Sequence, residues 1–343
     1  MITQILNLSE ITPLNRMQIE HLVHLSGDFT SSIIFEHKNR TINGKSMLGI
    51  LSMGATGNDP VKLIVEGVDE QEASRAITEL LKAGVVPPKS APDARALMQE
   101  IKDQFVSLLG ENLVGIYLHG SLAAGCFRWD RGDIDFLVVV KNPLPLEKKV
   151  ALLEKLHALE KRAPAGGFEM SVVLSSCCRV LSYPVPFELH YSASHREEFE
   201  LDPEGYCGRM HGEDPDLICH IMTLHAFGEA IFGPQIRKVF GPVRREYALN
   251  AIRYDVKDAL EHLHERPVYY VLNLCRSVAY QREELVLSKK AGGEWALKQM
   301  NSVYQRLIQA ALNAYDTGLD MVYDQGEAEA FRSEALAELG VKG

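Results

Sequence analysis

The chain has 343 residues, of which 46% are hydrophobic and 24% are charged, a composition typical of globular domains with buried cores. This composition excludes a largely disordered chain. The net charge of -10 argues against a nucleic-acid partner, because phosphate backbones are bound by clusters of Lys and Arg. A cationic small molecule suits an acidic protein better.

Targeting features are missing from the sequence. The N-terminal stretch MITQILNLSEITPLNR has no basic residue ahead of its apolar part, and no run approaches the roughly 18 consecutive apolar residues of a membrane span. The cysteines lack the paired short spacings of a zinc site, so we interpret them as reduced thiols. We therefore expect a cytoplasmic protein without a membrane partner.

Residues 1–85 have the pattern of a small domain of strands and helices. The segments with strand character are 31–43 and 61–66, and the segment with helical periodicity is 70–83. Gly84 can end this helix in a left-handed conformation, and the Pro-rich segment 86–92 cannot continue it. We therefore predict a linker at 86–92.

A second domain is predicted at 93–212, followed by a third at 213–343. The second has predicted helices at 93–110 and 146–162 and predicted strands at 113–119, 133–140, 168–174 and 187–191. From residue 213 the strands stop, and amphipathic stretches at 214–227, 245–263, 269–284 and 294–314 predict a helical bundle. The tail from Gln325 is expected to be a surface helix or a frayed end. The predicted fold class is α+β with several domains.

The sharpest feature is the segment LVGIYLHGSLAAGCFRWDRGDIDFLVVV at 113–140. One apolar strand runs into Gly120 and Ser121, and a second strand opens with Asp133 and Asp135. Residues two apart on a strand point to the same face, so the carboxylates project together, and such a pair is costly without a cation. Mg²⁺ is its natural partner, because this hard ion is bound by one or two carboxylates plus substrate phosphates. Gly120 lets the backbone approach a phosphate and the Ser121 hydroxyl can donate to it, so we predict a magnesium and triphosphate site.

Either Asp-X-Asp or Gly-Ser alone is common in solvated turns. Here the two motifs occur in this order and each is joined to an apolar strand, which favours the catalytic interpretation. GSLAAG followed by RGDID resembles the signature of the polymerase-β-type nucleotidyltransferase superfamily. Over residues 95–316 the chain resembles the aminoglycoside adenylyltransferases of the streptomycin/spectinomycin type. Further segments that carry this resemblance are FEMSVVL at 168–174, PFELHYS at 186–192, DPDLICHIMTLHAFGEAIFGP at 214–234, VLNLCRSVAY at 271–280 and SKKAGGEWAL at 288–297.

The resemblance implies a mixed αβ nucleotidyltransferase domain and a C-terminal helical bundle. It also implies transfer of AMP from ATP to an antibiotic hydroxyl with release of pyrophosphate. The family's tryptophan ahead of the VLNL-like helix is missing from HLHERPVYY at 262–270, which does not favour streptomycin as the acceptor. Whether ATP is preferred to GTP stays open.

The same resemblance implies roles for single residues. Asp133 and Asp135 correspond to the magnesium ligands, and Gly120 and Ser121 to the phosphate-contacting turn. Glu188 lies where the family keeps the glutamate that deprotonates the acceptor hydroxyl.

The alternative base is Glu169, one strand earlier, and we favour Glu188 over it. Lys289 matches the family's triphosphate-binding lysine, and Arg276 matches a basic residue that faces the nucleotide. Lys289 and Lys290 are also compatible with a solvent-facing pair at a helix end.

Residues 9–84 resemble HPr, the histidine-containing phosphocarrier of the sugar phosphotransferase system. The segments that carry the resemblance are HLVHLSGDFTSSIIF, NGKSMLGILSMG and VKLIVEGVDEQEASRAITELL, and they imply an open-faced β-sandwich. The phosphocarrier's Gly-Leu-His-Ala-Arg is PLNRM at 13–17 in this chain, with Asn15 at the histidine position, so we expect no phosphorelay. Ser46 matches the family's regulatory serine and is equally suited to cap a helix.

Two functions are therefore predicted. The leading one is an Mg²⁺-dependent nucleotidyltransferase that moves AMP from ATP to a hydroxyl of a cationic, aminoglycoside-like antibiotic. The alternative is a regulatory nucleotide-binding protein of the sugar phosphotransferase system that docks a protein partner through its HPr-like domain.

Overall fold

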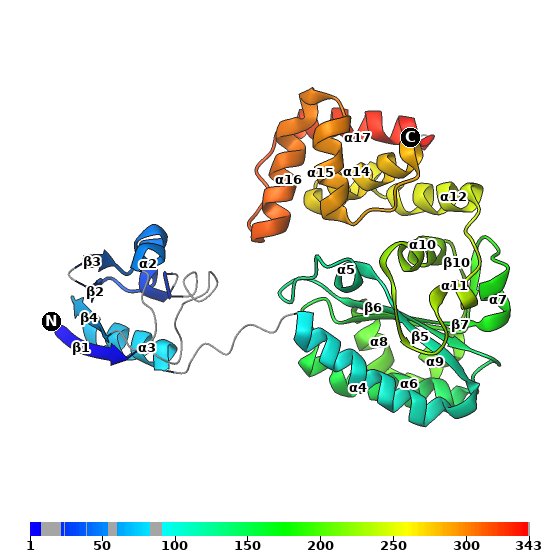
Figure 1. Ribbon diagram of the computed structural model, residues 1–343, viewed down its shortest axis with the longest axis horizontal. Coiled ribbons are helices and arrows are strands. Elements are labelled where there is room, and N and C mark those ends of the chain that lie inside the picture. The colour runs from blue at the N-terminus through cyan, green and yellow to red at the C-terminus, as the bar shows by residue number, and fades with distance from the viewer. Residues whose placement is uncertain (8–21, 24, 39, 54–59, 83–90, 342–343) are drawn as a thin grey trace. The chain divides into compact units, whose positions relative to one another are not determined.

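The computed structural model describes residues 1–7, 22–23, 25–38, 40–53, 60–82 and 91–341. The chain divides into two compact units, Met1–Pro88 and Lys89–Gly343 (Figure 1). The predicted linker at 86–92 falls at this division, although most of it lies outside the described residues, as does Asn15.

The first unit is a four-stranded antiparallel sheet with helices. Its elements are β1 (Ile2–Asn7), β2 (Ser32–His37), β3 (Arg40–Asn43), α2 (Met47–Met53), β4 (Pro60–Glu66) and α3 (Glu70–Lys82), and the strand order is β1-β4-β2-β3. Alternate residues of the strands, such as Ile33, Phe35 and Leu63, point inward and form one buried core with Ile77 of α3. The single strand predicted at 31–43 is a hairpin, because the chain turns after β2 and Lys38 takes a left-handed φ of 47°.

The second unit is built on a mixed five-stranded sheet of order β11-β5-β6-β7-β9. The strands are β5 (Leu113–Leu118), β6 (Ile134–Val140), β7 (Phe168–Leu174), β9 (Leu189–Tyr191) and β11 (Glu229–Phe232). The central strand β6 pairs antiparallel with β5 and parallel with β7. All of its residues are buried, because helices cover both faces.

The two faces of the sheet belong to two cores. Phe136 and Val138 pack with α4 (Ala91–Leu109), α6 (Leu146–Leu159) and α9 (Pro203–Arg209), the layer below the sheet in Figure 1. Leu137 and Val139 join the core of α10 (Leu217–Phe227) and α12 (Arg245–Val256). Strand alternation therefore connects the two cores through one sheet.

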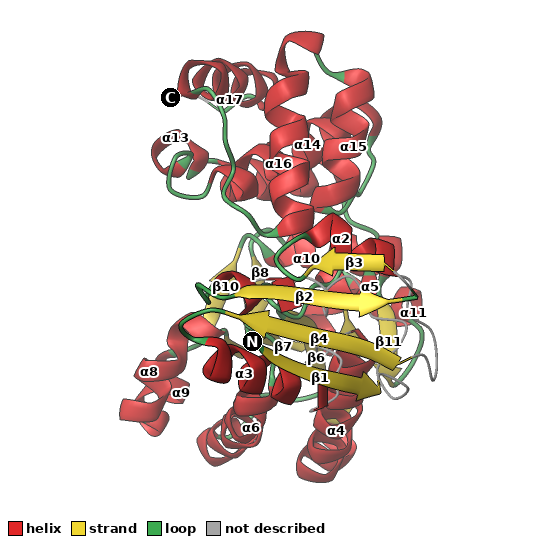
Figure 2. Cartoon of the chain, turned by 90° about the vertical axis from the view of Figure 1, so that its left-hand side faces the viewer, coloured by secondary structure: helices red, strands yellow, loops and turns green. Residues whose placement is uncertain are grey.

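The chain ends in a helical bundle that gathers at one end of the second unit in both views (Figures 1 and 2). Its helices are α14 (Pro267–Glu283), α15 (Lys289–Gln299), α16 (Gln305–Thr317) and α17 (Gln325–Leu339), and α14 packs against the other three. The single helix predicted at 294–314 is wrong, because a 3₁₀ turn at Ser302–Tyr304 separates α15 from α16. Of the two alternatives for the tail from Gln325, the helix is confirmed as α17, and the frayed end is wrong, since Phe331 of α17 is fully buried.

The expectation that strands stop at residue 213 is wrong as well. β11 pairs antiparallel with β5 and forms an edge of the main sheet, and β10 (Gly212–Asp214) pairs with β8 (Val185–Phe187). Both strands are too short to give a periodic signal. The helical C-terminus is present, and its separation as a third domain stays a prediction.

The remaining helices of the second unit are short. They are α5 (Gly120–Ala123), α7 (Ser175–Arg179), α8 (Arg196–Leu201), α11 (Ile236–Val239) and α13 (Ala259–His262). Among the described residues, no helix combines the length and apolar character needed to cross a bilayer.

Candidate active site

A cavity of about 360 Å³ lies in the second unit, between the sheet and the helices that follow it. The sheet side of its wall includes His119, Gly120, Ser121, Asp133, Asp135 and Glu169. The helical side includes Asp216, Cys219, His220, Asp255, Arg266, Tyr269, Arg276, Lys289 and Tyr315. Its size is that of an ordinary small-ligand pocket.

Three carboxylates converge in this cavity. Asp133 and Asp135 lie at the start of β6, and the parallel register of β6 and β7 sets Glu169 beside Asp135. One carboxylate oxygen from each lies within 4.8 Å of those of the other two. Burial, and then the charges of Asp133 and Glu169, raise the pKa of Asp135 well above its ordinary value.

The donor set of this cluster fits a hard divalent cation. Carboxylate oxygens are the ligands that Mg²⁺ takes, and a cation between them would offset the repulsion that raises the pKa of Asp135. Burial also raises the pKa of Glu169, with Asp133 adding to the shift.

Gly120 and Ser121 form the turn that faces the carboxylates. Gly120 has a φ of +65°, and a Cβ at this position would overlap the carboxylate of Asp135. The amide of His119 donates to the carbonyl oxygen of Asp135 at 2.9 Å and fixes the turn against β6. Ser121 Oγ is buried and has no hydrogen-bond partner among the described residues, which leaves its hydroxyl available to a ligand.

Two predicted cations line the opposite wall. Arg276 of α14 donates to Asn273 Oδ1 at 2.6 Å and lies 3.5 Å from Asp255 Oδ2. Lys289 Nζ lies 4.5 Å from the centroid of the Tyr269 ring. Burial and the nearby Arg276 lower the pKa of Lys289, and a bound anion would stabilise the charged form of this lysine.

Glu188 does not join these residues. Glu188 lines a separate cavity of about 500 Å³. Its amide donates to the Val172 carbonyl at 2.8 Å, and the Glu188 carbonyl accepts from Lys149 Nζ at 2.6 Å. The geometry favours the alternative base, Glu169, because strand pairing brings that residue to Asp135.

Ser46, the regulatory candidate, lies in the first unit just before α2. Its Oγ accepts a hydrogen bond from the Gly49 amide at 3.1 Å, which is the helix-capping contact that its position predicts.

Sequence reasoning missed His220 and its pairing with Asp216 and Glu169. His220 Nε2 lies 3.2 Å from Asp216 Oδ2 and 3.5 Å from Glu169 Oε1, and its ring contacts the tilted ring of His119 with 4.7 Å between their centroids. Burial alone would lower the pKa of His220, but the hydrogen bond and charge of Asp216, with the charge of Glu169, raise it to about 10. His220 is one of two histidines on the apolar helix α10, and such a position gives no periodic signal in the sequence.

Comparison with protein families agrees with this architecture. A nucleotidyltransferase domain model matches residues 98–165, and a model of the C-terminal domain of aminoglycoside adenylyltransferases matches 238–338. A third model, the phosphorylation site of the HPr component of the sugar phosphotransferase system, matches 17–83. The chain is therefore an enzyme of the nucleotidyltransferase class with an HPr-like region, as the sequence predicted.

Within this class the chain is similar to aminoglycoside adenylyltransferases. It is 28% identical to spectinomycin 9-adenylyltransferase of Staphylococcus aureus over 221 residues, which cover 61% of this chain and 80% of the relative. The crystal structure of spectinomycin adenyltransferase from Enterococcus faecialis with ATP and spectinomycin has the same fold, with a TM-score of 0.61 at 18% identity over 72% of this chain and 99% of that one. The HPr-like protein Crh of Halalkalibacterium halodurans is 37% identical over 54 residues, which are 16% of this chain and 64% of that protein.

Proposed function

We propose that the protein transfers AMP from ATP to a hydroxyl of an aminoglycoside-like antibiotic, with Mg²⁺ as cofactor and pyrophosphate as leaving group. The observation that carries this proposal is the convergence of Asp133, Asp135 and Glu169 on the Gly120-Ser121 turn in one cavity. The similarity to spectinomycin 9-adenylyltransferase supports the acceptor class.

Each wall of the cavity has its own task in this proposal. Asp133 and Asp135 would hold Mg²⁺, which when bound neutralises charge on the transferring phosphoryl group. The Gly120-Ser121 turn donates hydrogen bonds to phosphate oxygens, and Lys289 and Arg276 face them from the helices. These groups would thereby hold the α-phosphate in one geometry for attack by the acceptor hydroxyl, which lowers the entropic part of the barrier.

Glu169 is the proposed general base. Its carboxylate belongs to the acidic cluster, and burial raises its pKa from the ordinary carboxyl value toward neutrality, as suits a proton acceptor. His220 and Asp216 lie behind it, and we assign to His220 the role of orienting the Glu169 carboxylate.

Mass spectrometry tests the reaction. The protein is incubated with Mg²⁺, ATP or GTP, and a panel that begins with spectinomycin and includes streptomycin and other aminoglycosides. An AMP-sized mass gain on an acceptor, with release of pyrophosphate, is expected with ATP. No mass gain on any acceptor would contradict the proposed function.

A pair of matched variants tests the base. Glu169→Gln is expected to lower kcat by about 100-fold or more, because general-base catalysis contributes on that order, whereas Glu188→Gln should leave kcat near the wild-type value. Asp135→Asn is expected to abolish turnover. If Glu188→Gln lowers kcat and Glu169→Gln does not, Glu188 is the base.

For the HPr-like region we propose protein docking rather than phosphoryl transfer. The match to the HPr model over 17–83 supports this, while Asn15 lacks the ring nitrogen that a phosphocarrier needs. Phosphate on Ser46 would lie at the start of α2, where it would replace the present capping contact. The test is capture of sugar-phosphotransferase proteins by two variants of the full chain. Asp135→Asn tests docking, and Asp135→Asn combined with Ser46→Asp tests whether negative charge at Ser46 alters it.

A further inference from the structure

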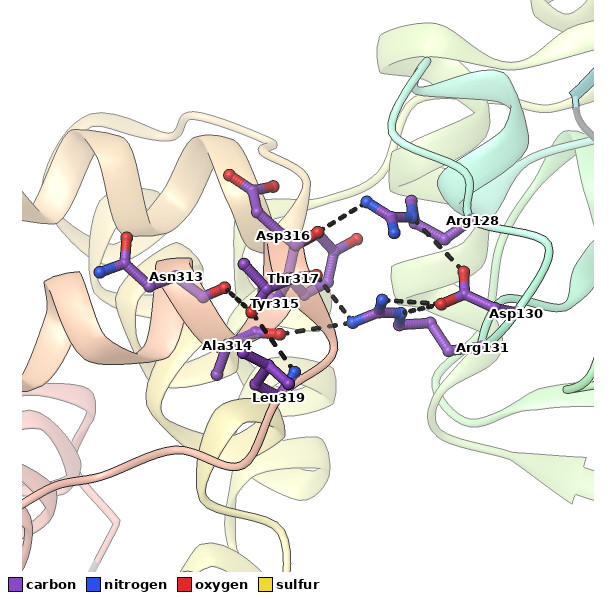
Figure 3. A network of polar contacts seen from close by, with 9 residues as sticks. All are labelled: Arg128, Asp130, Arg131, Asn313, Ala314, Tyr315, Asp316, Thr317 and Leu319. Carbon is purple, nitrogen blue, oxygen red and sulfur yellow. Dashed lines mark hydrogen bonds and ion pairs between the residues drawn. The ribbon is translucent and has the colours of Figure 1, made fainter. Parts of the chain in front are cut away.

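The loop that carries Asp133 also reaches the helical bundle. Between α5 and β6, Arg128 and Arg131 point toward the end of α16 (Figure 3). Arg131 Nη1 donates to the carbonyl oxygens of Ala314 at 3.3 Å and Tyr315 at 3.1 Å, and Arg128 Nη1 donates to that of Asp316 at 2.7 Å.

These contacts satisfy a helix end. The last carbonyl groups of a helix have no partner within the helix and carry its negative dipole end, so arginine donors suit them. α16 stops at Gly318, which has a φ of +79°, and a Cβ there would overlap the Arg131 guanidinium. The helix end and the arginine are therefore fitted to each other.

The same helix end also holds the opposite wall of the cavity. Lys290 Nζ lies 2.7 and 2.9 Å from the two carboxylate oxygens of Asp316, and Lys290 follows Lys289, the proposed phosphate contact. The neighbouring Tyr315 lines the cavity itself. The end of α16 thus connects the first turn of α15 with the loop before β6.

The loop transmits this contact to Asp133. The Gly132 amide donates to the Arg128 carbonyl at 2.7 Å, and the Gly166 amide donates to the Gly132 carbonyl at 2.8 Å. Asp130 pairs with Arg131 at 2.7 Å and with Arg128 at 3.4 Å. These contacts tie Arg131 to the backbone just before Asp133, so a shift at Arg131 is expected to displace Asp133 as well.

We propose that Arg128, Arg131, Asp316 and Lys290 form a clamp that sets the distance between the Asp133 carboxylate and Lys289. Arg131 and Asp316 are positioning residues in this scheme, because neither belongs to the cavity wall. The scheme rests on the proposed function in one respect, that Asp133 and Lys289 bind opposite ends of Mg²⁺-ATP.

The test measures binding, so that it does not depend on turnover. Titration calorimetry of the full chain with Mg²⁺ and a non-hydrolysable ATP analogue gives the affinity, and hydrogen exchange reports the amides of 126–133. Arg131→Ala is expected to weaken the complex roughly 10-fold, the lower end of the range for residues that support a metal ligand from outside its coordination shell, and to speed exchange in the loop. Arg131→Lys, which keeps one donor, should recover part of the affinity.

Arg282→Ala is the matched control. Arg282 donates to the Gln299 carbonyl at the end of α15 at 2.9 Å and pairs with Glu338, so it makes the same types of contact within the bundle. Its variant should lose stability without losing affinity. Equal affinities for wild type, Arg131→Ala and Arg282→Ala would overturn the clamp.

Asp316→Asn keeps the proposal testable if Arg131→Ala fails to fold. It removes only the exposed pair with Lys290, and it too should weaken binding of the Mg²⁺-ATP analogue; unchanged affinity would contradict the clamp. Failure of the proposed function has a different signature, namely wild-type protein that binds the analogue and modifies no acceptor.

Discussion

At Gly120 the phosphate-facing turn packs directly against the carboxylate of Asp135. The phosphate-facing turn and the Asp135 carboxylate occupy adjoining space, and only a residue without a side chain at a φ of +65° leaves room for both. The position therefore combines two demands, a left-handed backbone and a close approach.

A pair of alanine variants separates these demands. Gly120→Ala is expected to abolish turnover and lower the melting temperature, because its Cβ displaces the Asp135 carboxylate. Gly110→Ala has a similar left-handed φ of +53° but open space around its Cβ, so only the backbone strain of about 1–3 kcal/mol should appear, with turnover kept. Thermal unfolding and turnover of both variants check this; similar turnover in the two would contradict the close approach.

The site residues differ in how far the sequence reveals them. Asp133 and Asp135 share a strand, so their spacing alone predicts that they converge. Glu169 joins them only through the register of β7 against β6, and a linear pattern does not contain the register of a parallel pair. His220 comes from α10, a helix packed against the sheet, and only the packed structure brings it to Glu169.

Among the elements, α3 of the first unit is fixed by one carboxylate. Asp69 precedes the helix, and its oxygens accept hydrogen bonds from the amides of Thr30 at 2.7 Å and Ser31 at 2.9 Å, at the entry to β2. The Ser31 hydroxyl and then the Thr30 amide hold the pKa of Asp69 below its usual range. A lowered pKa contributes stability above the ordinary carboxyl pKa of about 4, and this contribution is lost as the pH falls.

Amide exchange of β2 in the full chain should follow this titration. After correction for intrinsic rates, exchange at 32–37 is expected to speed up in wild type as the pH falls below about 4, and Asp69→Asn should remove that pH dependence. Glu36→Gln serves as the control, because Glu36 lies on the same strand, β2, and its pair with Lys62 of β4 is half-exposed. If exchange at 32–37 in Asp69→Asn still speeds up below about pH 4, other carboxylates cause the pH dependence.

Long apolar elements follow the sequence better than their boundaries do. β7 has the predicted limits, because its mostly apolar run lies between the turn residues Gly166-Gly167 and the serines at 175–176. The stretch 294–314 keeps one amphipathic pattern across a break, where Asn301 caps the next turn by accepting from the Val303 amide. Such local caps compete with helix continuation, and periodicity alone does not detect them.

At the scale of the whole molecule, the two units have separate cores, and every residue of the proposed nucleotide site lies in the second. Ligand binding stabilises the state that it selects, by about 2.7 kcal/mol at a concentration 100 times Kd. Mg²⁺-ATP is therefore expected to slow exchange and raise the unfolding temperature of 91–341, while 60–82 stays unchanged.

Regional hydrogen exchange during thermal unfolding makes this measurement on the full chain. Asp135→Asn is the control, because it should lose the stabilisation without changing the first unit. Equal protection of both units by Mg²⁺-ATP would contradict the assignment of the site to the second unit alone.

The wall of the cavity runs from His119 to Tyr315, and this order matters during synthesis. A ribosome delivers the acidic centre and the Ser121 turn first, and the sheet gains its β11 edge before the bundle exists. The end of α16, which holds the Asp133 loop, emerges only after all strands of that sheet have been synthesised. A nascent polypeptide can thus fold its sheet early and still be unable to retain a nucleotide until α16 has formed.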